Sequence, residues 1–359
     1  MLTVRDRILG ERIARQGMAA RPCRTVAEAA AVTCAIQAQN DSASRLGIRA
    51  RAAPITEAEV LGAIAAAEVT RAWLMRGTIH LVDTADLRWL VRLVGPSVQR
   101  RFRSRWRQLG LADALLDRSV ELLPQVLTGR ALTRREITAG LAGLGVEFDD
   151  RDPQFHTHVV VHASTVGLVC RGADRGRDAT YVLLDEWAPS VPDGPHGDDA
   201  LAALARRFFS AFSPATAADF TSWSGLGSTR AVQLIRDELT EVDLEGRPGF
   251  RLGEVEPQAG LRLLPAFDNY LVGYRHRDAL LDEALRPFVY RGGVIDPTLV
   301  IDGRVAGTWS LSRSSKPARV TVRLFEPLRS GQRRALAAEV DDIARFLGRA
   351  AELNSVAEL

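Results

Sequence analysis

Helical segments that end in β-hairpins recur along this chain, and this recurrence limits the folds it can adopt. A capping box at Thr133 and Glu136 opens one helix, and a second helix follows from about Pro153. The apolar runs 167–171 and 180–184 then flank a polar turn, which predicts a β-hairpin. Two helices followed by a hairpin with a basic tip are typical of a winged helix, a variant of helix-turn-helix.

The same order of elements is predicted twice more. Residues 200–256 give helices followed by short strands, and residues 22–82 can be interpreted in the same way. In the latter stretch a helix capped by Thr25 is expected to run to about Gln37. We therefore expect an α+β fold with three tandem winged helices and a β-rich C-terminal part. The expected segments are residues 1–115, 116–190, 200–258 and 259–359.

The C-terminal segment carries the strongest hairpin signal. Residues 298–309 place apolar strands on both sides of Asp302-Gly303, a dipeptide favoured in two-residue hairpin turns. Residues 329–350 have the apolar spacing of an amphipathic helix. We expect a small sheet or barrel that this helix closes.

The composition is typical of a soluble protein in a reducing compartment. The chain has 359 residues, a net charge of +3, and Lys316 as its single lysine. An arginine bias follows from GC-rich coding or from phosphate recognition, and both explanations stay open. Three scattered cysteines argue against disulfides and zinc. A charged N-terminus and the lack of an apolar run of ~18 residues predict a cytoplasmic, nucleoid-associated protein that makes no membrane contact.

Known cofactor motifs are not found. The glycine-rich stretches match neither a phosphate-binding loop nor a dinucleotide fingerprint. His156, His158 and His162 suggest a metal site, but only the last two share a helix face. We therefore expect no metal and no cofactor.

A basic run follows Pro96, with Arg100, Arg101, Arg103, Arg105 and Arg107 interleaved with aromatic residues. It is consistent with a solvated helix face or with a surface for a nucleic-acid backbone. Winged helices with arginine-rich stretches point to DNA, and two classes remain: a transcription regulator and an enzyme that acts on DNA. A regulator would prefer one operator sequence, whereas a repair enzyme would bind duplexes almost without sequence preference.

The stretch Cys34–Ser42 contains two glutamines one residue apart, Gln37 and Gln39. Taken alone, it is consistent with a frayed helix end. Gln37-Ala38-Gln39 nevertheless resembles the Q-Φ-Q motif of the winged-helix DNA glycosylase family of AlkZ and YcaQ, on its AlkZ branch. The supporting stretches occur in the same order as in that family: residues 75–80, 223–226, 264–268, 273–275 and 302–309.

The resemblance implies three winged helices arranged as a C-shaped clamp around a DNA channel. It also implies excision of bulky N7-alkylated purines, including unhooking of interstrand crosslinks, with Gln37 and Gln39 as the catalytic residues. An N7-alkylated purine is already cationic and leaves without protonation. The catalytic task is then to hold a water, and an amide can do so with its acceptor and two donors. The partner is double-stranded DNA that carries alkylated purines or crosslinks, and we expect a monomer.

The candidate DNA contacts are Arg45, Arg76, His80, Arg275, Arg277, Asp302, Gly303 and Arg304. Ordinary surface charge or a satisfied polar group is the alternative for each. The hairpin at 298–309 is a candidate probe of the minor groove or a plain structural hairpin. Because Lys316 is the single lysine, a Schiff base is not expected, and the enzyme should be monofunctional.

Overall fold

The computed structural model describes residues 2–358 and confirms the α+β class. Within these residues, two helices followed by an antiparallel hairpin occur three times in chain order. The three sets are α3 (Asp41–Arg49), α4 (Glu57–Ala65), β2 (Val69–Trp73) and β3 (Ile79–Asp83); α7 (Arg134–Gly143), α8 (Phe155–Thr165), β4 (Val169–Arg171) and β5 (Tyr181–Leu183); and α11 (Ala217–Ser224), α12 (Ser228–Leu234), β6 (Leu239–Asp243) and β7 (Pro248–Leu252).

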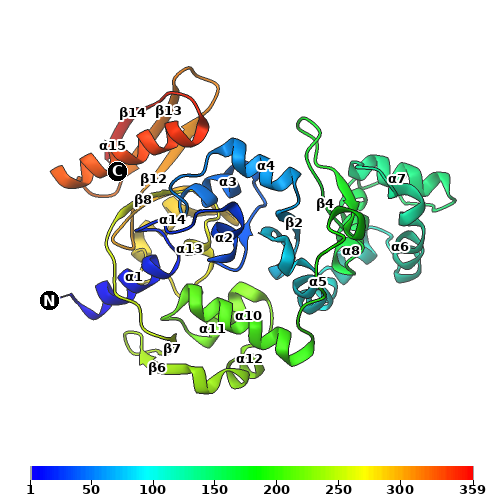
Figure 1. Cartoon of the computed structure of the whole chain (residues 1–359), viewed down its shortest axis with the longest axis horizontal. Helices are drawn as coiled ribbons and strands as arrows, with labels where there is room; N and C mark the ends of the chain where they lie inside the picture. The colour runs from blue at the N-terminus through cyan, green and yellow to red at the C-terminus, as the bar shows by residue number, and fades with distance from the viewer. Residues whose placement is uncertain (1, 359) are drawn as a thin grey trace. The chain divides into compact units, whose positions relative to one another are not determined.

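Two compact units make up the chain (Figure 1). Unit 1 consists of Met1–Gly62, Ala202–Trp223 and Gly227–Leu359, and unit 2 of Ala63–Leu201 and Ser224–Leu226. The sheet of unit 2 has the order β3-β2-β4-β5. The helices α5 (Leu87–Gln108), α6 (Asp113–Leu127), α7 and α8 pack with it around an apolar core that includes Trp73, Trp106 and Tyr181.

Helix α5 continues past Pro96 and carries the basic run on its C-terminal half. It crosses the end of α8 at Gly95, where a Cβ atom would lie 2.2 Å from the carbonyl oxygen of Thr165. Only glycine allows this approach of two backbones. The basic run from Arg100 to Arg107 lies on this helix.

Unit 1 holds the N-terminal helices and the C-terminal sheet. Its first elements are α1 (Val4–Arg15), α2 (Val26–Ala31) and β1 (Ile36–Gln37), and α10 (Gly197–Phe212) and α13 (Asn269–Val272) follow later in the chain. Aromatic side chains fill the core beside α10: Phe208, Phe212, Phe220, Trp223 and Tyr274 are all 0 to 1% exposed.

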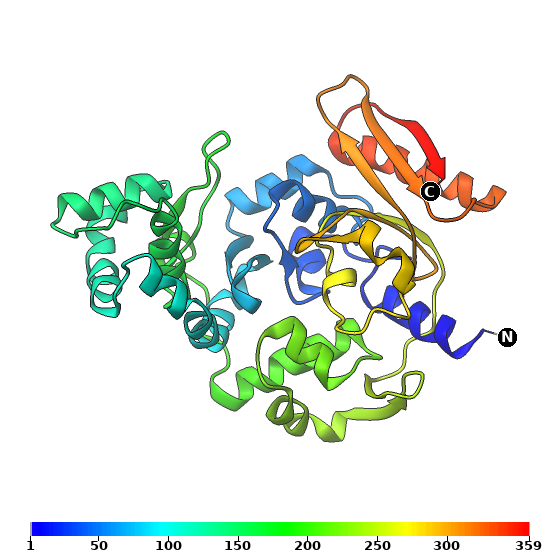
Figure 2. The ribbon, with the colours of Figure 1, turned by 180° about the vertical axis from the view of Figure 1, so that it is seen from behind.

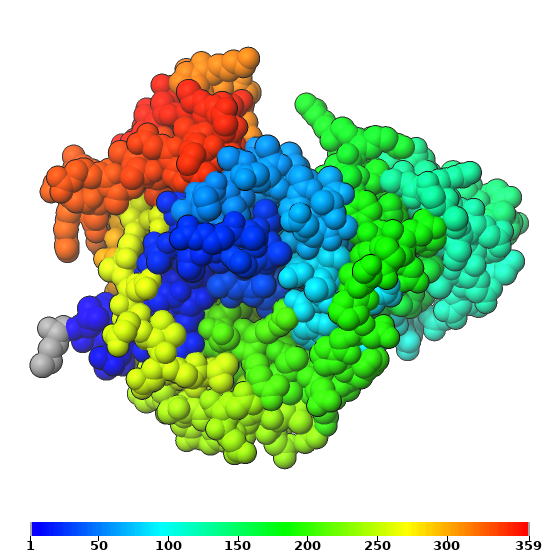
Figure 3. All heavy atoms as spheres, viewed as in Figure 1, coloured from blue at the N-terminus to red at the C-terminus, as the bar shows by residue number. Residues whose placement is uncertain are grey.

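The C-terminal sheet has the order β14-β13-β12-β11-β8. Its strands are β8 (Leu261–Leu264), β11 (Thr298–Ile301), β12 (Arg304–Ser312), β13 (Ala318–Leu324) and β14 (Ala351–Glu358). Helix α15 (Ser330–Leu347) covers one face and connects β13 to its parallel neighbour β14 (Figure 2). In the space-filling view the last part of the chain, coloured orange to red, gathers in one region of the visible face (Figure 3). The sequence predicted the helix but not β14.

The remaining elements are short. They are the helices α9 (Leu184–Trp187) and α14 (Arg286–Val289), the strands β9 (Tyr290–Arg291) and β10 (Val294–Ile295), and the 3-10 turns η1 (Met75–Gly77), η2 (Thr84–Asp86), η3 (Arg236–Glu238) and η4 (Glu283–Leu285).

Candidate active site

Gln37 and Gln39 lie in the connection between α2 and α3. The strand β1 ends at Gln37, which is 8% exposed, whereas Gln39 is exposed in the bend that follows. Asn40 then caps α3, because its side chain accepts a hydrogen bond from the backbone N–H of Ala43 at 3.0 Å. The motif therefore has one buried and one accessible amide.

The expected helix to about Gln37 is wrong. Helix α2 ends at Ala31, and Cys34 has a φ of 66°, in the left-handed region that a right-handed helix does not contain. The alanine-rich run predicted a longer helix from propensity, and tertiary contacts override that preference here. The motif is placed by a short strand and not by a helix end.

The side chain of Asn269 holds β1. Its Oδ1 accepts a hydrogen bond from the backbone N–H of Gln37 at 3.2 Å, and its Nδ2 donates to the backbone carbonyl of Ala35. Asn269 is 3% exposed and is the first residue of α13. One amide group thus satisfies the backbone N–H of Gln37 and the backbone carbonyl just before β1, as a neighbouring strand would.

Asp268, the residue before it, forms a buried ion pair with Arg51. The two guanidinium nitrogens Nη1 and Nη2 donate to Oδ2 and Oδ1 at 2.9 and 2.8 Å. The Arg51 side chain is 0% exposed and that of Asp268 1%. Oδ1 also accepts a hydrogen bond from the backbone N–H of Tyr270 at 2.9 Å, which caps α13. The carboxylate therefore fixes the helix that presents Asn269.

Arg51 and Asn269 were not identified from the sequence. Asp268 belongs to one of the stretches that carry the family resemblance, but its chemistry gave no separate signal. An arginine and an aspartate 217 residues apart cannot be paired from one sequence.

Arg45 lies on α3 and is paired within the protein. Its Nε donates to Glu57 at 2.8 Å, and Arg313 also binds this carboxylate at 2.8 Å. Burial by itself raises the pKa of Glu57, but the hydrogen bonds from Arg45 and Arg313 outweigh it and hold the pKa below its usual value. Two guanidinium groups on one carboxylate leave a net positive charge at this point.

Arg76 and His80 belong to the β2–β3 hairpin of unit 2. Arg76 is half-buried at the tip, where its φ of 58° makes the turn. His80 is 1% exposed, and its Nδ1 lies 3.0 Å from the carbonyl oxygen of Thr78. Burial lowers the pKa of His80 to about 3, and the charge of Arg76 acts in the same direction. A buried neutral imidazole is not accessible to a phosphate in this structure, which favours the alternative of a satisfied polar group for His80.

Arg275 and Arg277 follow the buried Tyr274 in unit 1. Arg275 is exposed, and its backbone N–H donates to Asp219 at 2.7 Å. Arg277 lies over the ring of Tyr290, with 4.5 Å from its guanidinium carbon to the ring centroid. Of the two side chains, Arg275 is thus the one directed to solvent.

The predicted hairpin with the Asp302-Gly303 turn is found, and both residues have positive φ, 49° and 85°. Its tip packs against the protein: a Cβ atom on Gly303 would lie 2.6 Å from Cβ of Leu9. The hydroxyl of Tyr270 donates to the Gly303 carbonyl at 2.8 Å. Gly303 therefore fills a packing role, and the turn does not project as a free probe.

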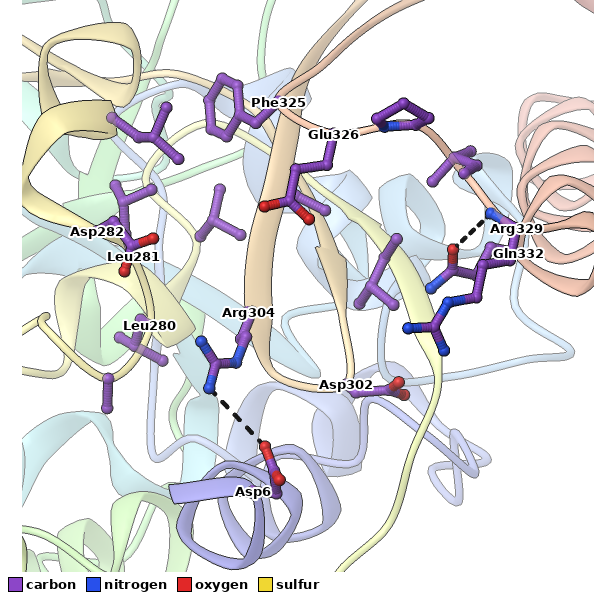
Figure 4. Close-up of a pocket in the computed structure, with 17 residues that line it drawn as sticks. Asp6, Leu280, Leu281, Asp282, Asp302, Arg304, Phe325, Glu326, Arg329 and Gln332 are labelled. Carbon is purple, nitrogen blue, oxygen red and sulfur yellow. Dashed lines mark hydrogen bonds and ion pairs between the residues drawn. The ribbon is translucent and has the colours of Figure 1, made fainter. Parts of the chain in front are cut away.

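Asp302 and Arg304 line a cavity of about 320 Å³ beside this turn (Figure 4). Arg304 faces Asp6, with 3.8 Å between Nη2 and Oδ1. The lining also includes Asp282, Glu326 and Arg329, so carboxylates outnumber guanidinium groups. A polyanion would be repelled from such a cavity, and neither Gln37 nor Gln39 lines it.

Two of the three histidines of α8 make hydrogen bonds inside unit 2, and His162 packs edge-on against Trp106. His158 accepts a hydrogen bond from Nε1 of Trp106 at 3.1 Å, and His156 contacts the Thr138 hydroxyl at 2.6 Å. Across residues 2–358, no group of three His, Cys, Asp or Glu is placed to hold a metal ion. No described helix is long and apolar enough to cross a bilayer.

Four arginines of α5 are exposed without an internal partner. Arg100, Arg101, Arg103 and Arg107 make no hydrogen bond or ion pair to any part of the chain that the structure describes. Arg105, in contrast, binds Asp152 at 2.5 Å. Residues 100, 103 and 107 share one helix face, so their charges form a row.

Comparisons with known proteins match nearly the whole chain. A family model described as "DNA glycosylase AlkZ-like" matches residues 30–346, which include all the candidate site residues. The "Interstrand DNA cross-link repair glycosylase" of Streptomyces sahachiroi is 30% identical over 318 residues, 84% of this chain and 86% of that protein. The solved structure "Streptomyces sahachiroi DNA glycosylase AlkZ" matches with a TM-score of 0.82 and 26% identity, covering 100% of both chains.

Proposed function

Because the chain belongs to the AlkZ-like DNA glycosylase family, as its motifs predicted, we propose that it excises bulky N7-alkylated purines from duplex DNA and unhooks interstrand crosslinks. The enzyme class and the DNA partner follow from the family. The relative's name adds crosslinks as the substrate class to test here.

One observation carries the proposal: the Gln37-Ala38-Gln39 motif lies within the matched region, and the backbone at Gln37, where β1 ends, is hydrogen-bonded to Asn269. Residues 36–40 contain no titratable side chain. The segment is suited to orienting a water molecule and not to transferring a proton.

The reaction needs little acid catalysis when the base is cationic. The C1′–N9 bond breaks with its electron pair passing to the alkylated purine, and the oxygen of a water molecule forms a bond to C1′. The proton of that water passes to solvent. Gln39, which is exposed, accepts a hydrogen bond from the water, and Gln37 supports the geometry from the buried side. The amide dipoles stabilise the positive charge that develops on the sugar.

Phosphate contacts would come from exposed arginines. Arg275 in unit 1 and the α5 row of Arg100, Arg103 and Arg107 in unit 2 are accessible, whereas Arg304 lines the acidic cavity and faces Asp6. Arg45 and Arg76 are half-buried and would contact DNA through the part of the guanidinium that remains exposed. The negative lining around Asp302 argues against a phosphate at that residue.

The product should be an intact abasic site. Strand cleavage through a Schiff base needs an amine, and the sequence offers a single lysine for this role. That lysine, Lys316, is exposed in the turn between β12 and β13. The enzyme would act as a monofunctional, monomeric glycosylase without metal or cofactor.

The direct test is a duplex that contains a single bulky N7-alkylguanine. Incubation with the enzyme should release the base, and heat or alkali should then cut the strand at that position. A neutral modified base in the same context should remain. No release from bulky or methyl adducts, together with tight binding to one operator sequence, would favour a regulator instead.

A further inference from the structure

The strand β1 has only two residues, Ile36 and Gln37. The Asn269 side chain adds two bonds to it, one to the N–H of Gln37 and one to the carbonyl of Ala35. Both bonds are made to the backbone, so Asn269 fixes the course of the chain at Gln37 and does not contact the Gln37 side-chain amide through them.

Asn269 is itself held on a rigid support. Its neighbour Asp268 is fixed by Arg51, whose Nη1 also donates to the carbonyl of Gly47 at 3.0 Å. Arg51 and Gly47 belong to α3 and the residues just after it. The chain that follows the glutamines thus anchors the residue that positions them.

Helix α3 also approaches the strand directly at Gly47. A Cβ atom on Gly47 would lie 3.2 Å from Cγ2 of Ile36 and 3.9 Å from Oδ2 of Asp268. The contact is closer than an ordinary side chain permits without a shift. Gly47 therefore restricts Ile36 by packing, and Asn269 restricts the backbone at Ala35 and Gln37 by hydrogen bonds.

We propose that Asn269 is a positioning residue for glycosidic hydrolysis: its side-chain amide sets the backbone of β1 and thereby the placement of the Gln37 and Gln39 amides. The inference rests on the proposed function and deepens it. Asn269 acts through the strand and does not touch the substrate. A displacement of about 1 Å in a catalytic group lowers a rate by up to roughly a hundredfold.

Two readouts test the proposal on the full chain. Hydrogen exchange of the backbone N–H of Gln37 should accelerate in Asn269→Ala, because the acceptor of its hydrogen bond is lost. The single-turnover rate on an N7-alkylguanine duplex should fall roughly ten- to a hundredfold, while the dissociation constant for the duplex changes less than about twofold. Gly47→Ala, which pushes Ile36 from the α3 side, should also lower the rate and spare duplex binding.

A double-mutant cycle separates positioning from general destabilisation. Asn269→Ala should cause no further loss in a Gln37→Ala/Gln39→Ala background, because the groups it places are absent. Ser164→Ala is the matched control: it removes a buried hydroxyl in unit 2 that donates to the Val169 carbonyl at 2.9 Å and makes no bond to β1. This control variant should have a lower melting temperature and the wild-type single-turnover rate.

Full single-turnover activity in Asn269→Ala, or an equal loss with and without the glutamines, would overturn the proposal. An unchanged exchange rate of the backbone N–H of Gln37 in Asn269→Ala would overturn it as well. A wild-type enzyme that binds the duplex and excises no alkylated base would refute the proposed function, whereas the exchange measurement would still report whether Asn269 holds the strand.

Discussion

Arg51 and Asp268 form a two-pronged ion pair in the interior of unit 1, with N–O distances of 2.8 and 2.9 Å. Both side chains are at most 1% exposed. A buried pair of this kind does not by itself guarantee stability, because each ion has lost its hydration. Its contribution here is geometric: the pair fixes the start of α13 and, through Asn269, the backbone of β1 at Gln37.

Breaking this pair on one side should be costly. Arg51→Met leaves the Asp268 carboxylate buried without its cation, and we expect a loss of about 3–5 kcal/mol in the free energy of unfolding in urea. Arg118→Gln is the control, because Arg118 and Glu121 are 57% and 66% exposed and their pair should contribute under about 1 kcal/mol. The double variant Arg51→Met/Asp268→Asn should recover part of the loss. Equal, small losses in Arg51→Met and Arg118→Gln would contradict this account.

The arginine row on α5 should contribute to duplex affinity through counterion release. Each phosphate contact adds about 0.9 to the slope of log K against log salt, so Arg100→Gln/Arg103→Gln/Arg107→Gln should lower the slope by roughly 2.7. Fluorescence anisotropy with an undamaged duplex at several salt concentrations measures it. Arg105→Gln is the control on the same helix, because that arginine is already paired with Asp152. An unchanged slope in the triple variant would identify the row as a solvated helix face.

Local features of the fold could be predicted, because they depend on neighbours in sequence. The caps at Thr25 and Thr133 each satisfy two backbone donors within four residues, and both are found. The Asp302-Gly303 turn needs only residues that accept positive φ.

Features that depend on distant residues could not be predicted. The Gln37–Asn269 hydrogen bond joins residues 232 apart, and the alanine run before it favoured a helix that the tertiary contacts cut short at Ala31. Likewise, β14 was missed because Ala351–Glu358 has little apolar alternation, and its pairing with β13 depends on the return of the chain through α15. The two glutamines could be proposed as catalytic from a motif, whereas the residues that support them could be found only in the structure.

His80 should make unit 2 sensitive to acid. Its pKa is lowered by burial from 6.5 to about 3, so the unfolded chain binds the proton more strongly. The stabilising effect of the neutral imidazole is complete above about pH 6.5 and is lost as the pH falls toward 3. His80→Asn should therefore lose less stability than the wild type between pH 7 and about pH 5 in urea titrations. Parallel pH profiles for the two proteins would show that folding does not lower the pKa of His80.

The central claim is that the two glutamines perform the hydrolysis. Its most direct test is the single-turnover excision rate of a bulky N7-alkylguanine duplex by the wild type, Gln37→Ala, Gln39→Ala and the double variant, with duplex affinity measured in parallel. We predict that each single variant loses at least about tenfold in rate, that the double variant loses most of the activity, and that affinity is kept. A double variant that excises the base at the wild-type rate would contradict the account.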